Sequence, residues 1–170
     1  MTAGFAIRPL RRDEIDTLLD QLEEIAEERR WIGSEPPIPR DRWQEEFERR
    51  WDDDYYALLA SVDEEDRLIG HLTANGRRGA AAEIGMAIIK EWRGRGVGSA
   101  LMQACVDWAH ERGIHKLALH VWPHNDAAIR LYEKFGFERE GTHRAYAMRD
   151  GKYVDTLTMA RLHPSQPLVR

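Results

Sequence analysis

Cysteine is nearly absent from this chain of 170 residues, and long apolar runs are missing. The single cysteine, Cys105, excludes an intrachain disulfide and with it a secreted disulfide-rich scaffold. No stretch approaches the roughly 18 apolar residues of a membrane-spanning helix, and no basic segment followed by an apolar run stands at the start. We therefore expect a cytoplasmic protein without a membrane partner.

The chain also lacks the residue spacing of a metal site. Its seven histidines form no ligand pattern, and Pro123 between His120 and His124 argues against one helical face that carries both. Cys105 shares a helical stripe with apolar residues such as Val97, which is typical of a buried structural thiol. The sequence predicts no bound metal.

Charge is unevenly divided along the chain. Residues 1–79 carry twelve Lys and Arg against twenty Asp and Glu, a net charge of −8, whereas residues 80–170 carry thirteen against ten, a net charge of +3. No basic cluster is interleaved with aromatic residues, so the composition gives no support for a nucleic-acid partner. An anionic ligand would favour the second, cationic part of the chain.

Length and the absence of repeats predict a single domain over residues 1–170, with a loose tail over residues 163–170. Apolar periodicity predicts strands over residues 5–10, 55–62, 68–75, 81–89, 116–121, 137–148 and 153–162. It predicts helices over residues 15–26, 43–51, 96–113 and 126–135. Strands that alternate with helices and end in a hairpin indicate an α/β fold with a mixed sheet.

A glycine-rich turn joins the predicted strand 81–89 to the predicted helix 96–113. Gly94, Gly96 and Gly98 permit a tight turn and a close approach of a ligand to the backbone, and the first N–H groups of the helix have no intrahelical partner. This combination predicts a site for an anion such as a pyrophosphate. A P-loop is excluded because no lysine follows Gly98, and Ser99 stands where a dinucleotide fingerprint would have its third glycine.

The turn and a second motif together resemble the GNAT superfamily of acetyl-CoA-dependent N-acetyltransferases. The turn has the arginine-x-x-glycine-x-glycine pattern at Arg93, Gly96 and Gly98, and residues 125–137 have an asparagine-x-x-alanine-x-x-x-tyrosine-x-x-x-glycine-phenylalanine pattern. The resemblance extends over residues 4–162 and is strongest to phosphinothricin and L-amino acid acetyltransferases. It implies a GNAT-like sheet of about seven strands flanked by about four helices, in which strands 81–89 and 116–121 are parallel neighbours that splay apart and admit acetyl-CoA.

The resemblance also assigns a cofactor site. The strand before the turn would bind the pantetheine arm, and the turn would bind the pyrophosphate. Asn125 would contact the pantetheine, cap its helix, or do both. A backbone N–H near residues 86–88, where family members carry a β-bulge, would stabilise the oxyanion. The residues so assigned are Met86, Ala87, Ile88, Arg93, Gly94, Arg95, Gly96, Val97, Gly98, Ser99 and Asn125.

Two side chains are candidates for acid–base catalysis. Tyr132 occupies the tyrosine position of the second motif and would protonate the departing CoA thiolate, although a packing aromatic would fit the same spacing. Glu83 matches the glutamate that amino-acid-type members use as a base, directly or through water, because the amine must lose a proton. A solvated glutamate at a strand edge would give the same pattern.

The acceptor is less closely defined. The resemblance predicts direct attack by a primary amine in a ternary complex, with an L-amino acid or analogue favoured as the small-molecule acceptor. Ribosomal-protein or peptide N-termini, polyamines and aminoglycosides stay open, and a non-catalytic acyl-CoA-binding module is the alternative of a different class. The resemblance also implies a homodimer. Walls of the acceptor site are expected among Trp31, Trp43, Tyr55, His143, Tyr146 and Tyr153.

Overall fold

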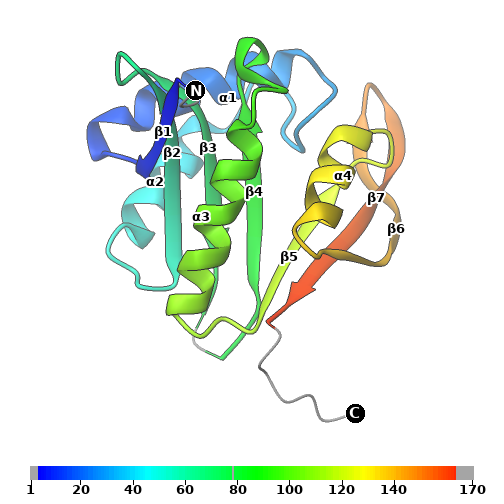
Figure 1. The fold of residues 1–170 in the computed structure, drawn as a ribbon. Coiled ribbons are helices and arrows are strands. Elements are labelled where there is room, and N and C mark those ends of the chain that lie inside the picture. Colours follow the sequence, from blue (N-terminus) through cyan, green and yellow to red (C-terminus); the bar gives the residue numbers. More distant parts are fainter. Residues whose placement is uncertain (1–3, 78, 164–170) are drawn as a thin grey trace.

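The computed structural model describes residues 4–77 and 79–163. Within them, seven strands form one mixed sheet in the order β1-β2-β3-β4-β5-β7-β6 (Figure 1). The strands are β1 (Phe5–Pro9), β2 (Tyr56–Asp63), β3 (Leu68–Asn75), β4 (Ala82–Ile88), β5 (Lys116–Val121), β6 (Glu138–Arg149) and β7 (Lys152–Leu162). The helices are α1 (Ile15–Glu27), α2 (Arg40–Arg50), α3 (Val97–Glu111) and α4 (Asp126–Lys134), with short 3-10 turns at Arg12–Glu14 and Lys90–Trp92. No helix of the described residues is long and apolar enough to cross a membrane.

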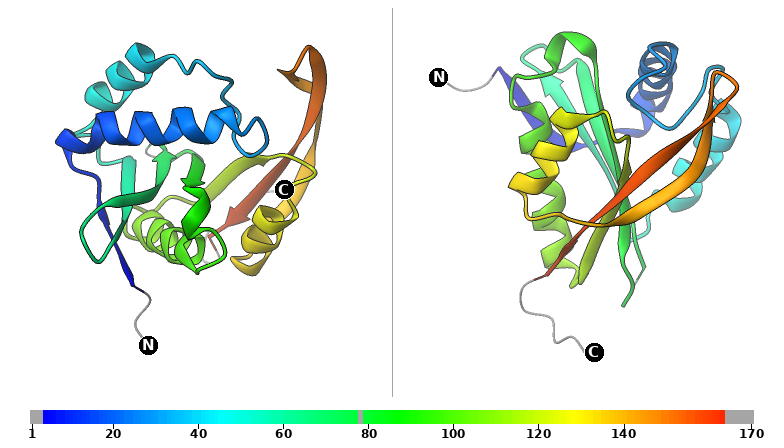
Figure 2. Two further views of the ribbon diagram at one scale, coloured as in Figure 1. Left: turned by 90° about the horizontal axis from the view of Figure 1, so that it is seen from above. Right: turned by 90° about the vertical axis from the view of Figure 1, so that its right-hand side faces the viewer.

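Helices cover both faces of the sheet, α3 and α4 on one and α1 and α2 on the other (Figure 2). The apolar stripe predicted for α3 packs in the core that α3 and α4 form with the sheet, here called the first core. The stripe includes Cys105, whose thiol pKa is raised by burial to about 12. The stripe of α1, represented by Leu18 and Leu22, packs in the core that α1 and α2 form with the opposite face of the sheet, here called the second core. The apolar stripe of each of these helices is therefore the side that packs on the sheet.

Strands β4 and β5 are parallel, but they pair only at their first residues. The paired positions are Ala82 with Leu117 and Glu83 with Ala118, after which the two strands diverge (Figure 1). On its other side, β4 keeps an unbroken antiparallel ladder with β3, from Glu83 to Ile88. The splay implied by the resemblance is therefore present. The β-bulge implied near residues 86–88 is absent from this ladder, because β4 separates from β5 without a change of register toward β3.

The β6–β7 hairpin reaches across to the segment between α1 and α2. The Arg149 guanidinium donates to the Ser34 carbonyl at 3.2 Å and to the Ile32 carbonyl. At the hairpin turn, Asp150 forms an exposed ion pair with Arg29 at 2.6 Å. These contacts bring two segments more than a hundred residues apart to one end of the sheet (Figure 2).

The predicted elements agree with the observed ones to within a few residues at each end. The largest difference is at α2, which begins at Arg40, three residues before its first aromatic residue, Trp43. Of the predicted loose tail, only His163 is described, and its N–H donates to the His115 carbonyl at 2.7 Å. The rest of that prediction lies outside the described residues.

Candidate active site

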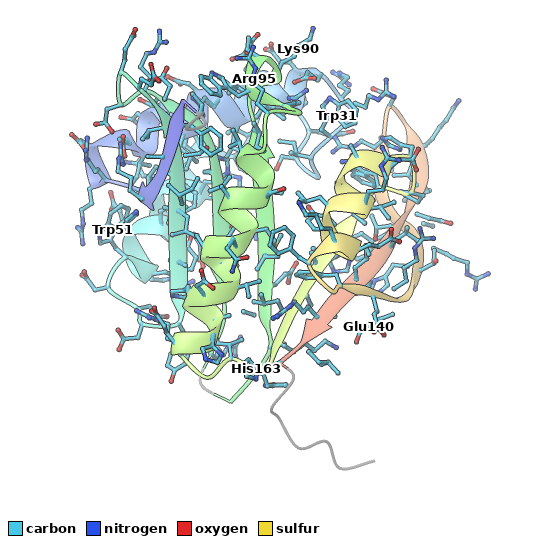
Figure 3. All side chains as sticks on the ribbon, viewed as in Figure 1. Trp31, Trp51, Lys90, Arg95, Glu140 and His163 are labelled. Atoms are coloured by element: carbon cyan, nitrogen blue, oxygen red, sulfur yellow. The ribbon has the colours of Figure 1, made fainter. Side chains whose placement is uncertain are left out.

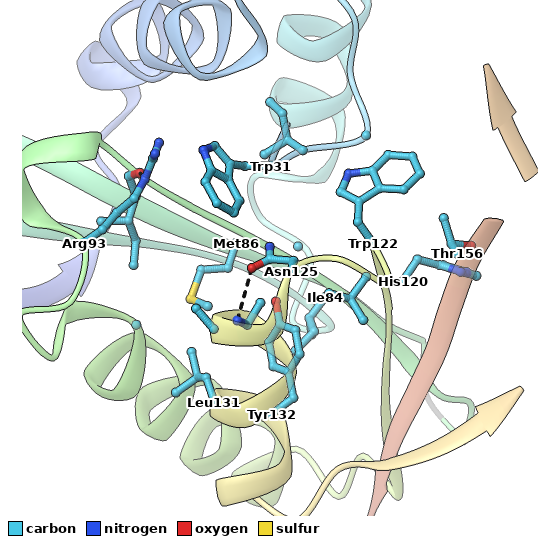
Figure 4. Close-up of a pocket in the computed structure, with 18 of the residues that line it drawn as sticks. Trp31, Ile84, Met86, Arg93, His120, Trp122, Asn125, Leu131, Tyr132 and Thr156 are labelled. Atoms are coloured by element: carbon cyan, nitrogen blue, oxygen red, sulfur yellow. Dashed lines mark hydrogen bonds between the residues drawn. The ribbon is translucent and has the colours of Figure 1, made fainter. Parts of the chain in front are cut away.

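A cavity of about 850 Å³ lies where β4 and β5 separate. Its lining residues come from both faces of the sheet: the start of α3 and the side of α4 on one, and the α1–α2 segment and the β5–β7–β6 surface on the other (Figure 4). The cavity therefore passes through the sheet at the splay. It is lined by Trp31, Ile32, Gly33, Ile84, Gly85, Met86, Ile88, Arg93, Gly94, Gly96, Gly98, Ser99, His120, Val121, Trp122, Asn125, Ala127, Ala128, Leu131, Tyr132, Tyr146, Ala147 and Thr156.

The glycine turn shapes one wall for two different reasons. Gly94 and Gly96 have φ values of 73° and 89°, a left-handed conformation that side chains disfavour. Gly98 has an ordinary φ, but a Cβ there would lie 3.0 Å from Leu131 Cδ2 and 3.3 Å from Ile88 Cδ1. Gly96 caps α3 without a side-chain hydrogen bond, so the first N–H groups of the helix stay available at the cavity. Lys90 and Arg95 project from this end of the molecule (Figure 3).

The edge of β4 that faces the cavity carries unpaired backbone groups. Ile89 donates its N–H to Ile69 of β3 at 3.1 Å, and bonded positions alternate along an antiparallel ladder. Met86 and Ile88 therefore turn their N–H and C=O groups away from β3, toward the gap. Arg93 Nε donates to the Ile88 carbonyl at 2.8 Å, which agrees with this orientation.

Arg93 lines the cavity, but its guanidinium is already engaged. It binds both carboxylate oxygens of Glu28 at 2.8 and 2.5 Å and lies 5.6 Å from the ring centroid of Trp31. Hydrogen bonding to Arg93 lowers the pKa of Glu28, which therefore stays ionised at neutral pH. Arg93, which the sequence predicted to bind the pyrophosphate, thus links the end of α1 to the glycine turn.

Tyr132 lies in the cavity wall on α4, with its ring against Phe137 at a centroid distance of 5.8 Å. The side chain is buried, and this burial raises the pKa of Tyr132 to about 12. No described residue is hydrogen-bonded to its hydroxyl, which points toward the gap between β4 and β5 (Figure 4). Tyr132 is therefore both a packing aromatic and a protonated phenol at the cavity.

Four other predicted site residues do not line the cavity. Glu83 is exposed at the last paired position before the splay, on the face of β4 opposite Ile84. Ala87 and Val97 are buried in the two cores, and the Arg95 guanidinium lies over the Trp92 ring. Neighbouring residues in the same segments do line the cavity, and the sequence could not tell which side chains turn inward.

Asn125 does line the cavity, and it caps α4 by accepting a hydrogen bond from the Ala128 N–H at 3.2 Å (Figure 4). The capping role predicted for Asn125 is therefore present, and its contact with the pantetheine stays a prediction. Its cap fixes the start of α4, the helix that carries Tyr132.

Of the six expected acceptor-site aromatics, Trp31 and Tyr146 line the cavity. Trp43 packs in the second core and Tyr153 is 69% exposed. Three residues that the sequence analysis did not assign, His120, Trp122 and Thr156, line it instead. The signal for His120 was its place on β5, where it shares a face with Ala118, opposite the buried leucines.

Comparisons with known proteins agree with this geometry. The acetyltransferase (GNAT) family matches residues 19–137. The L-amino acid N-acetyltransferase AaaT of Escherichia coli is 38% identical over 135 residues, 74% of this chain and 79% of that protein. The phosphinothricin N-acetyltransferase of Streptomyces coelicolor is 26% identical over 160 residues, 91% of this chain and 94% of that protein.

The solved structures extend the likeness to the fold. A phosphinothricin acetyltransferase from Sinorhizobium meliloti, in complex with AcCoA, has a TM-score of 0.83 at 21% identity and covers 94% of this chain and 88% of that one. The chain belongs to the GNAT acetyltransferase family and is an N-acetyltransferase with the fold of that family.

Proposed function

We propose that this enzyme transfers the acetyl group of acetyl-CoA to the primary amine of a small molecule by direct attack in a ternary complex. The observation that carries the proposal is the gap between β4 and β5. It has unpaired β4 backbone on one side, and the start of α3, which no side chain caps, lies at its mouth. A long, narrow thioester with an anionic end matches this combination.

The chain's own groups offer two kinds of contact to acetyl-CoA. The N–H groups of residues 97–99 would bind the pyrophosphate, because they lack intrahelical partners and lie at the positive end of α3. The unpaired groups of Met86 would bond to the pantetheine amides as a neighbouring strand would. A backbone N–H of Met86 or Ile88 would also meet the oxyanion.

Tyr132 is the proposed acid. As the amine nitrogen bonds to the thioester carbon and the carbon–sulfur bond breaks, the sulfur leaves as a thiolate that needs a proton. Burial keeps the Tyr132 phenol protonated at neutral pH, and its hydroxyl has no described protein partner that would compete for the proton. The products are the amide and CoA thiol.

A small amino acid or amino acid analogue is the proposed acceptor. Support comes from the names of relatives, which include L-amino acid, phosphinothricin and L-methionine sulfone acetyltransferases. Glu83, the base predicted from the sequence, would have to act through water because it lies outside the cavity wall. The homodimer and the cytoplasmic location stay predictions from the sequence.

The proposal is tested by release of CoA thiol from acetyl-CoA across L-amino acids, methionine sulfone, phosphinothricin, polyamines, aminoglycosides and N-terminal peptides. We expect turnover with small amino acids. Gly98→Val should weaken acetyl-CoA binding at least tenfold by filling the space beside Leu131, whereas Gly141→Val on β6, where a Cβ meets nothing within 4 Å, serves as the control. Acetyl-CoA binding without thiol release for any acceptor would favour a non-catalytic module.

A further inference from the structure

The acceptor side of the cavity contains a group of buried polar atoms without partners. His120 Nδ1, Thr156 Oγ1 and Thr158 Oγ1 are all inaccessible to solvent, and no described residue is hydrogen-bonded to them. Buried polar atoms are nearly always paired in folded proteins, so a small rotation that pairs these atoms with one another is expected to fix the His120 ring. His120 Nε2 is not among the buried atoms and has no hydrogen-bond partner among the described residues, so it is the ring nitrogen open to the cavity. The residues belong together, because Thr158 lies directly opposite His120 in the β5–β7 ladder and Thr156 follows two positions along.

Two of these residues turn their side chains into the cavity. His120 and Thr156 both line it, and Thr156 is only 3% exposed (Figure 4). The His120 ring is held by an almost parallel stack on Tyr146, with a centroid distance of 5.0 Å and an interplanar angle of 13°. The orphaned atoms therefore belong to a fixed ring and a buried hydroxyl at the wall, and not to mobile surface groups.

The position along the strands brings His120 close to where the chemistry must occur. Glu83 pairs with Ala118 at the last contact between β4 and β5, and His120 lies two residues further, where the gap has opened. Counted on from this last pair, the position of β4 across the gap from His120 is Gly85, which lines the cavity and has no side chain to occupy the space. An acceptor nitrogen beside the thioester would lie between this glycine and the imidazole.

We propose that His120 accepts the proton of the attacking amine at Nε2, the ring nitrogen that is not among the buried atoms, and that the buried Thr156 hydroxyl positions the ring from behind. The inference rests on the proposed function and identifies its proton acceptor. An ammonium acceptor first gives one proton to His120, and the neutral amine then attacks the thioester carbon. As the carbon–sulfur bond breaks, Tyr132 protonates the departing thiolate. The amide nitrogen gives up its second proton, which restores the Tyr132 phenol through solvent, and His120 then releases its own proton to solvent.

Imidazole suits this role because it exchanges protons near neutral pH and needs no charge to accept one. The His120 ring is surrounded mostly by uncharged groups. His143 and Tyr146 face it from β6, Thr156 and Thr158 from β7, and Glu83 lies across the gap on β4. Glu83 is the only carboxylate among these groups.

The test compares His120→Gln with the matched control His115→Gln, at the other end of the same segment and outside the cavity. We expect His120→Gln to lower kcat by about 10²- to 10³-fold, to remove the acid limb of the kcat/KM profile, and to leave acetyl-CoA affinity within about twofold. His120→Ala should regain activity with added imidazole. Thr156→Val should lower kcat less than His120→Gln does and should shift the acid limb without removing it, because the hydroxyl acts through the ring.

The inference is overturned if His120→Gln keeps the acid limb, or if Glu83→Gln alone removes it. If His120→Gln loses acetyl-CoA binding, His120→Asn is tested in its place. An acid limb in the kcat/KM profile of His120→Asn would also overturn the inference. Failure of wild-type enzyme to turn over any amine is a separate result, since it would reject the proposed function itself.

Discussion

Tyr132 is buried, but no described residue is hydrogen-bonded to its hydroxyl. Loss of this hydroxyl should therefore affect the chemistry more than the stability. We expect Tyr132→Phe to lower kcat by about 10²-fold, with little change in acetyl-CoA affinity or in the free energy of unfolding. Steady-state kinetics and urea unfolding check this. Tyr153→Phe, at a 69% exposed position on the hairpin, is the control. Unchanged turnover in Tyr132→Phe would reduce Tyr132 to a packing residue.

His71 gives a prediction about pH and stability. It is 5% exposed on β3, and burial lowers its pKa from 6.5 to about 4. Below pH 6.5 the unfolded chain binds a proton at His71 that the folded chain does not. The free energy of unfolding therefore decreases as the pH falls from 6.5 to about 4. The loss amounts to about 3 kcal/mol in the free energy of unfolding.

Urea unfolding at pH 7 and pH 4.5 measures this dependence. His71→Gln should lose less stability on acidification than the wild type, whereas His115→Gln should lose as much. Acidic groups with lowered pKa values, such as Glu14 and Glu28, also destabilise the fold in acid, but they are common to all three proteins. Equal acid sensitivity in His71→Gln and the wild type would contradict the prediction.

Single residues differ in how well the sequence could predict them. Tyr132 was predictable because a motif fixes its place relative to the start of its helix. His120 was not, because a histidine on one face of a short strand looks the same whether it meets solvent or a cavity. Arg93 lies at the cavity, but its partner Glu28 lies 65 residues away in the chain, and no local pattern predicts such a contact.

The turn into α3 is the element on which the site depends, and Gly96 is its most constrained position. Its φ of 89° is unfavourable for any residue with a Cβ, yet no atom lies within 4 Å of where that Cβ would be. Gly96→Ala should therefore lower the free energy of unfolding by about 1–2 kcal/mol through backbone strain alone. Gly141→Ala, with equal space and no positive φ, should change it little.

Chemical denaturation measures both variants, and acetyl-CoA affinity should fall with Gly96→Ala because relief of strain reorients the N–H groups at the helix start. An unstrained Gly96→Ala protein with normal affinity would mean that the turn tolerates another conformation.

The sequence predicted the helices and strands well. Period-two and period-3.6 patterns predicted every strand and α-helix, because each element buries one face against a core. The missing bulge in β4 shows the limit of resemblance. A bulge depends on how the strand meets both neighbours, and β4 leaves β5 without one.

At the scale of the whole molecule, Arg149 links the β6–β7 hairpin to the α1–α2 segment. Its side chain is 11% exposed and donates to two carbonyls of that segment. Arg149→Met keeps the apolar stem but leaves those carbonyls unpaired. We expect the free energy of unfolding to fall by about 2 kcal/mol and KM for the amine to rise, while acetyl-CoA affinity holds.

Asp150→Asn is the comparison, because it removes a neighbouring ion pair whose side chains are 52% and 63% exposed. It should change stability by less than about 1 kcal/mol. Equal effects of the two substitutions would mean that the hairpin is held by charge and not by the buried bonds. The sequence could not predict either contact, since both join segments that only the complete sheet brings together.

The cavity that passes through the sheet has a consequence for inhibitor design. Cofactor and acceptor would approach from opposite faces and meet at the splay, so neither blocks the path of the other. A single compound that joins an acceptor amine to CoA sulfur through a two-carbon bridge would fill both halves at once. Because the second half then binds at a high effective concentration, its affinity should exceed that of either half by about 10²- to 10⁴-fold.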